Sequence, residues 1–171
     1  KGCERLVDAW PRVRDHHPSA ELTIVGPGDH PDAYESVPGV TVAGYVEELA
    51  DAFRDASLFV QPSQGDAFPV STLEAMRAGV PPLVTLATGT RSEARAVDGS
   101  LVVDTSVDAL ARGVTRYLDT DLARREALSA TARERGARFD EASRTAAFRA
   151  AFERLLAEIE AAGAVTSAGG R

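Results

Sequence analysis

Two carboxylates separated by seven residues are the feature of this sequence that most directly suggests chemistry. Asp66 lies in a polar stretch after a short apolar run, and Glu74 lies in the helical pattern that follows. A carboxylate accepts two hydrogen bonds and can hold the vicinal hydroxyls of a ribose or a hexose. Between the two, the predicted helix start near Val70 and Ser71 offers free amides and a positive dipole end, which favour phosphate. A ligand with a sugar, a diphosphate and a ribose in series fits this order of groups.

The same carboxylates have a purely structural alternative. Asp66 could cap the following helix, and Glu74 could pair with Arg77, which lies three positions later on the same helix. Spacing alone leaves the ligand-binding and the structural alternatives open. Pro69 is compatible with both, because proline is tolerated in the first turn of a helix, where its missing N–H would have no partner.

A second candidate segment, Gly26-Pro27-Gly28, follows another apolar run. Its glycines suit a tight turn that needs positive φ, or backbone that faces a ligand, and the sequence leaves both open. The segment lacks the third glycine of the dinucleotide-binding fingerprint, and no acidic residue ends the next strand to hold a ribose. A dinucleotide-dependent oxidoreductase is therefore the least fitting class of enzyme.

Both candidate segments follow predicted strands. Five short, nearly continuous apolar runs indicate strands that are covered on both faces, as in a parallel sheet. Their spacing of roughly fifteen to twenty-five residues leaves room for a helical crossover each time. Ligands of such sheets bind outside the carboxyl ends of the strands, which is where both segments lie. The predicted strands are Leu22–Val25, Val40–Val42, Leu58–Val60, Leu83–Leu86 and Leu101–Val103.

Helical patterns fill the intervals between these runs. Thr105 and Asp108 resemble a capping box and predict the start of one helix. The other predicted helices are one with a stripe from Leu6 to Val13, and segments at about Glu47–Asp55, Val70–Ala78, Leu122–Arg138 and Glu141–Ala161. The sequence therefore predicts an α/β fold, a doubly wound, Rossmann-like parallel sheet with a helical C-terminal extension.

The predicted domain covers residues 1–162, and the small, polar residues 163–171 are predicted to form a disordered tail. The chain opens on a helix, whereas such folds normally open on a strand. We therefore expect a first strand, and a further domain, to precede Lys1.

The composition narrows the partners and the compartment. The net charge of −7 argues against nucleic acid and anionic membranes as bulk partners. The single cysteine, Cys3, excludes an internal disulfide and fits a reducing cytoplasm. No apolar run approaches the roughly 18 residues of a membrane helix. We expect a cytoplasmic protein, held at the membrane surface only if its acceptor is a lipid, and no metal site.

The segment from Gly65 to Gly79 resembles the signature of the group 1, GT4-type retaining glycosyltransferases, whose two facing Rossmann-like domains form the GT-B fold. That signature is typically Glu-Gly-Phe-Gly-x-x-x-x-Glu-Ala-Met-x-x-Gly. The residues that match it are Asp66, Phe68, Glu74, Ala75, Met76 and Gly79. The resemblance extends over nearly the whole chain, including Lys1-Gly2, the glycines around Gly26, Gly44-Tyr45-Val46 and Val80–Val84.

By this resemblance the chain is expected to be the C-terminal, donor-binding domain of such an enzyme. Glu74 would hold the ribose hydroxyls of a nucleoside diphosphate sugar, such as a UDP- or GDP-sugar. Asp66 would hold hydroxyls of the transferred sugar near the reacting carbon. The amides near Phe68 and Val70 would face the diphosphate, and Val46 would face the base.

Three further positions carry expectations from the same resemblance. Lys1 matches the lysine of the family's Gly-Arg-x-x-x-x-Lys-Gly stretch, which neutralises the leaving diphosphate without a metal or another cofactor. Gly26 and Gly28 fall in the family's donor-side turn. Asp66 departs from the family's usual glutamate and reaches less far by one methylene. Because the partner arginine and the acceptor domain are not in this sequence, the chain alone is expected to bind donor weakly and to be inactive.

The predicted function is transfer of a hexose-type sugar from a nucleoside diphosphate sugar to an acceptor, with retention at the anomeric carbon. Two alternatives stay open: a non-catalytic nucleotide-sugar-binding module, and a nucleotide-sugar epimerase of the same fold. The spacing from Asp66 to Glu74 and the Glu-Ala-Met run fit the transferase better than the epimerase. The sugar, the base and the acceptor are not specified by these residues.

Overall fold

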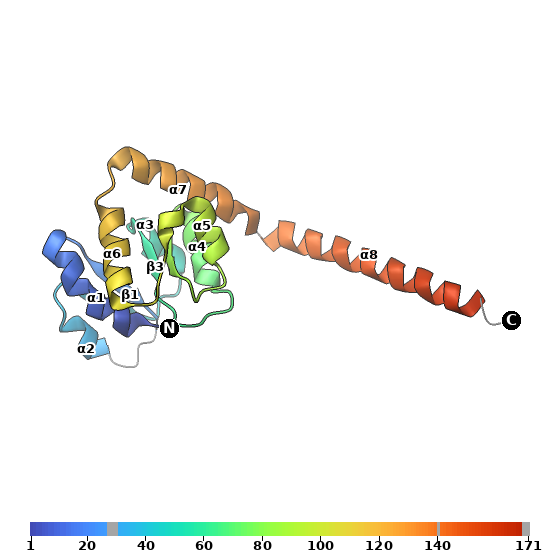
Figure 1. The fold of residues 1–171 in the computed structure, drawn as a ribbon, viewed down its shortest axis with the longest axis horizontal. Coiled ribbons are helices and arrows are strands. Elements are labelled where there is room, and N and C mark those ends of the chain that lie inside the picture. The colour runs from blue at the N-terminus through green and yellow to red at the C-terminus, as the bar shows by residue number, and fades with distance from the viewer. Residues whose placement is uncertain (27–30, 140, 169–171) are drawn as a thin grey trace. The chain divides into compact units, whose positions relative to one another are not determined.

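The computed structural model describes residues 1–26, 31–139 and 141–168, which divide into two compact units between Ala137 and Arg138. The first unit alternates helices with short strands (Figure 1). Its strands are β1 (Leu22–Val25), β2 (Val40–Gly44), β3 (Phe59–Gln61), β4 (Pro82–Thr85) and β5 (Val102–Val103). Its helices are α1 (Cys3–His16), α2 (Pro31–Glu35), α3 (Leu49–Arg54), α4 (Val70–Ala78), α5 (Arg91–Val97), α6 (Val107–Leu118) and α7 (Leu122–Gly136). Two 3-10 turns lie at Gly99–Leu101 and Ala137–Phe139.

The strands form two parallel sheets. β1 pairs with β2, and β4 lies between β3 and β5. All four residues of β4 are buried, as expected for a strand with neighbours on both edges and helices on both faces. The α/β architecture with parallel strands and flanking helices is thus confirmed. The described strands nevertheless fall into two sheets, where the sequence predicts one.

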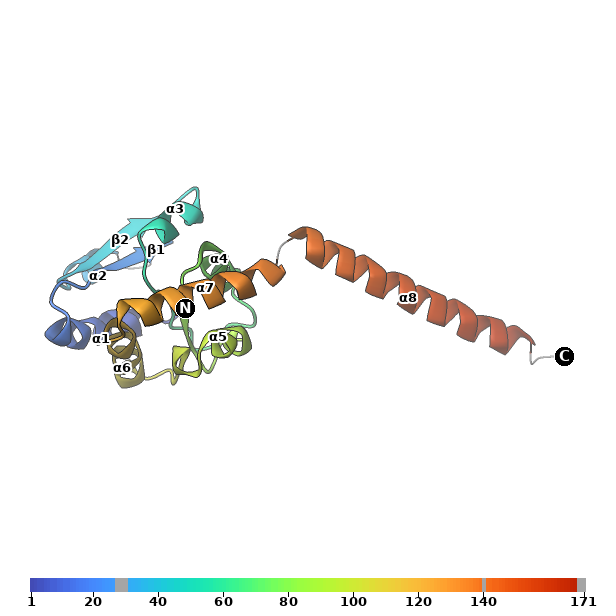
Figure 2. The same ribbon diagram turned by 90° about the horizontal axis from the view of Figure 1, so that it is seen from above.

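Helices cover these strands on two sides. α1 and α6 lie against each other in both views (Figures 1 and 2), and their apolar faces build the main core together with side chains of β1, β2, β4 and β5. Trp10 and Val13 of α1 and Leu110 and Val114 of α6 are buried there. A smaller core joins α3 and α4 through Phe53 and Ala75. The central strand β4 is therefore covered on both faces, as predicted. The β1–β2 sheet is not, because Thr23 of β1 and Thr41 and Ala43 of β2 are exposed.

The start of α6 differs from the prediction. Ser106, not Thr105, is the N-cap residue, and its hydroxyl accepts a hydrogen bond from the amide of Ala109 at 3.3 Å. Thr105 instead supplies a backbone carbonyl to the Arg5 guanidinium at 2.9 Å. The sequence offers two adjacent hydroxyls, and because the helix begins at Val107, Ser106 stands at the cap position.

Asp98 joins the end of α5 to α7. Its carboxylate accepts a hydrogen bond from the Ser100 amide at 2.8 Å and forms an ion pair with Arg124. Hydrogen bonds from Ser100, followed by the charge of Arg124, hold the pKa of Asp98 below its ordinary value. The carboxylate therefore stays ionised to a lower pH than an ordinary aspartate, which preserves its ion pair with Arg124 of α7.

The second unit contains α8 (Glu141–Ala168). The helix continues past Gly163, where the sequence predicts the start of a disordered tail, and the compact first unit ends at Ala137 rather than at residue 162. Phe148 and Phe152 stack with ring centroids 6.1 Å apart and are exposed. Among the described helices, none is both long enough and apolar enough to cross a bilayer.

The cap of α6 yields a direct test. Ser106→Ala should lower the free energy of unfolding by about 1 kcal/mol, because an amide in the first turn loses its acceptor. Thr105→Ala is the matched control and should change it by less than about 0.5 kcal/mol, since the contact of Thr105 uses its backbone. Chemical denaturation of the two variants measures both values. A larger loss in Thr105→Ala would contradict the assignment of the cap.

Candidate functional site

Lys1 and Asp66 meet although they lie far apart in the sequence. The Lys1 Nζ atom is 3.1 Å from Oδ2 of Asp66, and the side chains are 76% and 15% exposed, respectively. Asp66 is thus mostly sheltered, while the ammonium group remains in solvent. The structure brings together the residue expected to hold the transferred sugar, Asp66, and the residue expected to neutralise the leaving diphosphate, Lys1.

The position of Lys1 depends on a close backbone contact at the next residue. Gly2 has φ of +84° and lies against Pro62, the residue that follows β3. A methyl group built on Gly2 would overlap the Pro62 carbonyl oxygen. α1 then begins at Cys3, so the contact holds Lys1 at the carboxyl end of β3.

Asp66 is held by the loop that follows β4. Its amide donates to the Ala87 carbonyl at 3.2 Å, and its carbonyl accepts from the Gly89 amide at 2.8 Å. These bonds form a parallel bridge between Asp66 and Thr88, beyond the ends of β3 and β4. A side chain at position 89 would overlap the Ala67 carbonyl oxygen, so only glycine allows the two loops to approach this closely.

The start of α4 lies a few residues after Asp66. Pro69 is its N-cap residue and supplies no side-chain acceptor, so Asp66 does not cap this helix. Phe68 and Val70 flank the cap and are 48% and 61% exposed. Because the N-terminal amides of a helix carry partial positive charge, this end of α4 suits an anion. The sequence places Pro69 in the first turn, whereas the structure places it one position earlier.

Glu74 lies on the exposed face of α4, about one turn from its start. No ion pair joins it to Arg77 among the residues that the structure describes. Among the described residues, therefore, Asp66 does not cap α4 and Glu74 does not pair with Arg77, so neither structural alternative is present. Asp66 contacts Lys1, and Glu74 is exposed.

The remaining predicted site residues form a separate group. Gly26, with φ of +116°, follows β1, and its amide donates to the Gly44 carbonyl at the end of β2 at 2.7 Å. Val46 comes two residues later and is half-buried. Gly28 lies outside the described residues. Gly26 and Val46 follow the carboxyl ends of β1 and β2, as predicted, and the structure gives no contact that joins them to Asp66.

A group of buried hydroxyls lies beside the two site loops, and the sequence analysis did not name it. Thr85 closes β4, and Thr88 and Thr90 follow it, each fully buried. Ser63 and Thr72, on the other loop and on α4, are buried as well. The repeated threonines after an apolar strand were the available signal, because a fully buried hydroxyl needs a partner.

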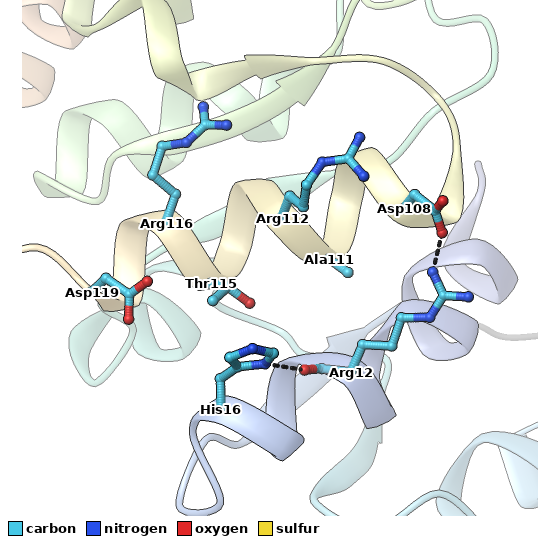
Figure 3. Close-up of a pocket in the computed structure, with 8 residues that line it drawn as sticks. All are labelled: Arg12, His16, Asp108, Ala111, Arg112, Thr115, Arg116 and Asp119. Carbon is cyan, nitrogen blue, oxygen red and sulfur yellow. Dashed lines mark hydrogen bonds and ion pairs between the residues drawn. The ribbon is translucent and has the colours of Figure 1, made fainter.

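A groove of about 550 Å³ lies elsewhere, between α1 and α6 (Figure 3). Arg12 and Asp108 close one end of it as an ion pair, and Arg112 and Arg116 line it from α6. Its lining residues include none of the predicted site residues. Among the described residues, no group of three or more His, Cys, Asp and Glu side chains is placed to hold a metal ion.

Residues 1–120 match the model of a family described as glycosyl transferases group 1. The chain belongs to this family. The match covers both site loops, α4 and the strands that carry them. The resemblance found in the sequence is therefore confirmed for the family and for its GT-B type of fold.

Individual relatives agree with this membership. A glycosyltransferase of Methanocaldococcus jannaschii, named as uncharacterized, is 33% identical over 128 residues, which are 69% of this chain and 33% of that protein. Mannosylfructose-phosphate synthase of Agrobacterium fabrum is 30% identical over 103 residues, which are 50% of this chain and 23% of that protein. A solved sucrose-phosphate synthase from Thermosynechococcus elongatus superposes with a TM-score of 0.76 at 26% identity, covering 92% of this chain and 43% of that one. The chain spans a third or less of these two curated relatives.

The contact at Gly89 can be tested by adding one methyl group. Gly89→Ala should lower the free energy of unfolding by about 1–3 kcal/mol, because the loops must separate to admit the side chain. Gly99→Ala is the matched control, since position 99 has open space around it, and should change stability by less than about 0.5 kcal/mol. Denaturant titration measures both. Equal stability of the two variants would mean that the loops are not in close contact.

Proposed function

We propose that this chain is the donor-binding domain of a retaining glycosyltransferase that moves a hexose-type sugar from a nucleoside diphosphate sugar to an acceptor. The observation that carries the proposal is the placement of Lys1 beside Asp66, next to a helix start that has no side-chain cap. Cation, carboxylate and helix start are the groups that a sugar diphosphate requires. Family membership supports sugar transfer, as do the names of two relatives, which are synthases of mannosylfructose phosphate and sucrose phosphate.

Each predicted site residue takes one part of the donor in this proposal. Asp66 accepts hydrogen bonds from hydroxyls of the transferred sugar, and Glu74 accepts them from the ribose. The amides near Phe68 and Val70 donate to the diphosphate. Val46 packs against the base, with the Gly26–Gly28 turn on the same side of the donor.

The chemistry assigned to these groups is electrostatic. As the bond to the anomeric carbon breaks, negative charge grows on the leaving diphosphate, and Lys1 and the α4 dipole stabilise it. We propose that departure needs no metal for this reason. None of the site residues is a committed nucleophile, so we propose that the acceptor attacks on the face from which the diphosphate leaves. In this proposal the acceptor binds to residues of a further domain. The whole protein is proposed to be cytoplasmic.

We also propose that an additional parallel strand lies between β1 and β3 and leads into Lys1. The amides of Leu22 and Gly26 donate to the β2 side. Because successive amides of a strand point to opposite edges, the amides of Thr23 and Val25 point to the other edge of β1. Phe59 donates to Pro81, beside β4, so the Val60 amide points away from β4. A strand between these edges would join both sheets into one sheet with the order β2, β1, additional strand, β3, β4, β5, which is typical of dinucleotide-binding folds. Lys1 would then lie at the point where the strand order reverses.

Hydrogen exchange tests the additional strand. In a longer polypeptide that includes the residues before Lys1, the amides of Thr23, Val25 and Val60 should exchange at least about tenfold more slowly than in this chain. The Leu22 amide, which donates to Gly39 at 2.8 Å, is the internal control and should be protected in both forms. Unchanged exchange at all three amides would contradict the proposed strand.

Donor binding tests the proposed function. In the full-length protein, Glu74→Ala should weaken binding of one nucleoside diphosphate among UDP, GDP and ADP by about 1.5–3 kcal/mol, roughly tenfold to 150-fold. Arg77→Ala, one turn further along the exposed face of α4, is the matched control and should leave the affinity unchanged. Isothermal calorimetry with the three diphosphates and their sugar conjugates gives the values. Equal affinity of Glu74→Ala and the parent protein would refute the ribose contact.

A further inference from the structure

We propose that the buried hydroxyl of Thr85 is the positioning group for Asp66 and thereby for the contact with the transferred sugar. This inference rests on the proposed function, because it assigns the sugar contact to Asp66. Thr85 itself is fully buried and touches no ligand in this scheme. It acts through the two loops that hold the carboxylate.

Thr85 makes two hydrogen bonds with its single hydroxyl. Its Oγ1 atom donates to the Ser63 carbonyl at 2.5 Å. The same atom lies 3.1 Å from Oγ1 of Thr88. Since a hydroxyl has one proton and that proton goes to Ser63, Thr88 must be the donor in the second bond. One buried oxygen therefore connects the loop after β3 with the loop after β4.

Asp66 lies where these two loops meet. On one side, Ser63 precedes it by three residues in the same loop. On the other side, Thr88 stands opposite Asp66 in the parallel bridge, and the flanking bonds run from Asp66 to Ala87 and from Gly89 to Asp66. The Thr88 amide in turn donates to the Thr85 carbonyl at 3.1 Å. Thr85, the last residue of the central strand β4, thus contacts the Asp66 loop directly through Ser63 and indirectly through Thr88.

Loss of the hydroxyl should move the loops. In Thr85→Val the side chain keeps its branched shape, but the Ser63 carbonyl loses its donor and the Thr88 hydroxyl loses its acceptor in a buried place. Unsatisfied buried polar groups are costly, so these groups should turn toward other partners or solvent. Asp66 would then move relative to Lys1 and the start of α4. Thr85→Ser keeps the hydroxyl and should keep the geometry.

The readout that separates positioning from simple stability is the preference for the sugar conjugate. Because Asp66 contacts the sugar and Glu74 the ribose, Thr85→Val in the full-length protein should lower affinity for the conjugate by about tenfold. It should leave affinity for the matching free diphosphate unchanged. The probes are UDP with UDP-glucose, GDP with GDP-mannose and ADP with ADP-glucose, measured by calorimetry. Thr85→Ser should retain the parent preference for the conjugate.

Thr90→Val is the matched control. Thr90 is equally buried and lies on the same loop, but its hydroxyl donates to Thr72 at 3.3 Å, and among the described residues its side chain makes no hydrogen bond to Ser63 or Thr88. It should keep the parent ratio of affinities. If Thr90→Val and Thr85→Val lower both affinities alike, the hydroxyl serves stability alone and the inference is overturned.

Two further measurements separate this inference from the proposed function. Asp66→Asn should itself remove the preference for the conjugate; if it does and Thr85→Val does not, the positioning role fails while the proposed function stands. If Asp66→Asn has no effect, the sugar contact is wrong. The positioning role is then decided by hydrogen exchange in this chain, where Thr85→Val should speed exchange of the Asp66 and Gly89 amides about tenfold. Unchanged exchange would overturn it.

Discussion

The contact between the loop after β3 and the loop after β4 is the constraint on which the candidate site depends. Two backbone hydrogen bonds pair Asp66 with the segment around Thr88. Gly89 lets the two loops approach so closely that no side chain fits at this position. Loops rarely hold a side chain precisely unless a rigid element supports them. Here the support is β4, which is buried along its whole length. Its last residue, Thr85, donates a hydrogen bond to the Ser63 carbonyl in the loop after β3. The Asp66 backbone is thus fixed through its own hydrogen bonds and the buried hydroxyls, and its carboxylate is left to contact Lys1.

A different kind of contact holds Lys1. The backbone at Gly2 packs against the Pro62 carbonyl, so the start of α1 is set by steric fit, while the ammonium group is largely in solvent. An exposed ion pair contributes little to stability. The pairing of Lys1 with Asp66 is therefore weak evidence for a structural role of either residue. The pairing instead fits the proposed function, in which Lys1 faces an anion and Asp66 faces hydroxyls of the same ligand.

Local pattern predicted much of this architecture. The bounds of α4 matched the prediction from Val70 to Ala78, because an apolar stripe and a terminal glycine specify a helix locally. The strands were placed within about a residue or two at each end, which is the usual uncertainty of such boundaries. The errors have two sources. α6 begins at Val107, so Ser106 rather than Thr105 is at the cap position, a shift of one residue. The division of the strands into two sheets depends on which strand edges meet, which no local pattern specifies.

The site shows the same division between local and non-local information. Asp66 and Glu74 were chosen as candidate ligand-binding residues from residue type and spacing, because carboxylates at this spacing suit the groups of a sugar nucleotide. The buried hydroxyls of Thr85 and Thr88 were not found, because a threonine in a strand is equally suited to solvent, to packing or to a hydrogen bond, and only burial distinguishes these cases. Once buried, such hydroxyls must be paired, and the pairing fixes the loops. Candidate ligand-binding carboxylates can thus be named from the sequence, whereas the buried hydroxyls beside them become visible only when the chain is folded.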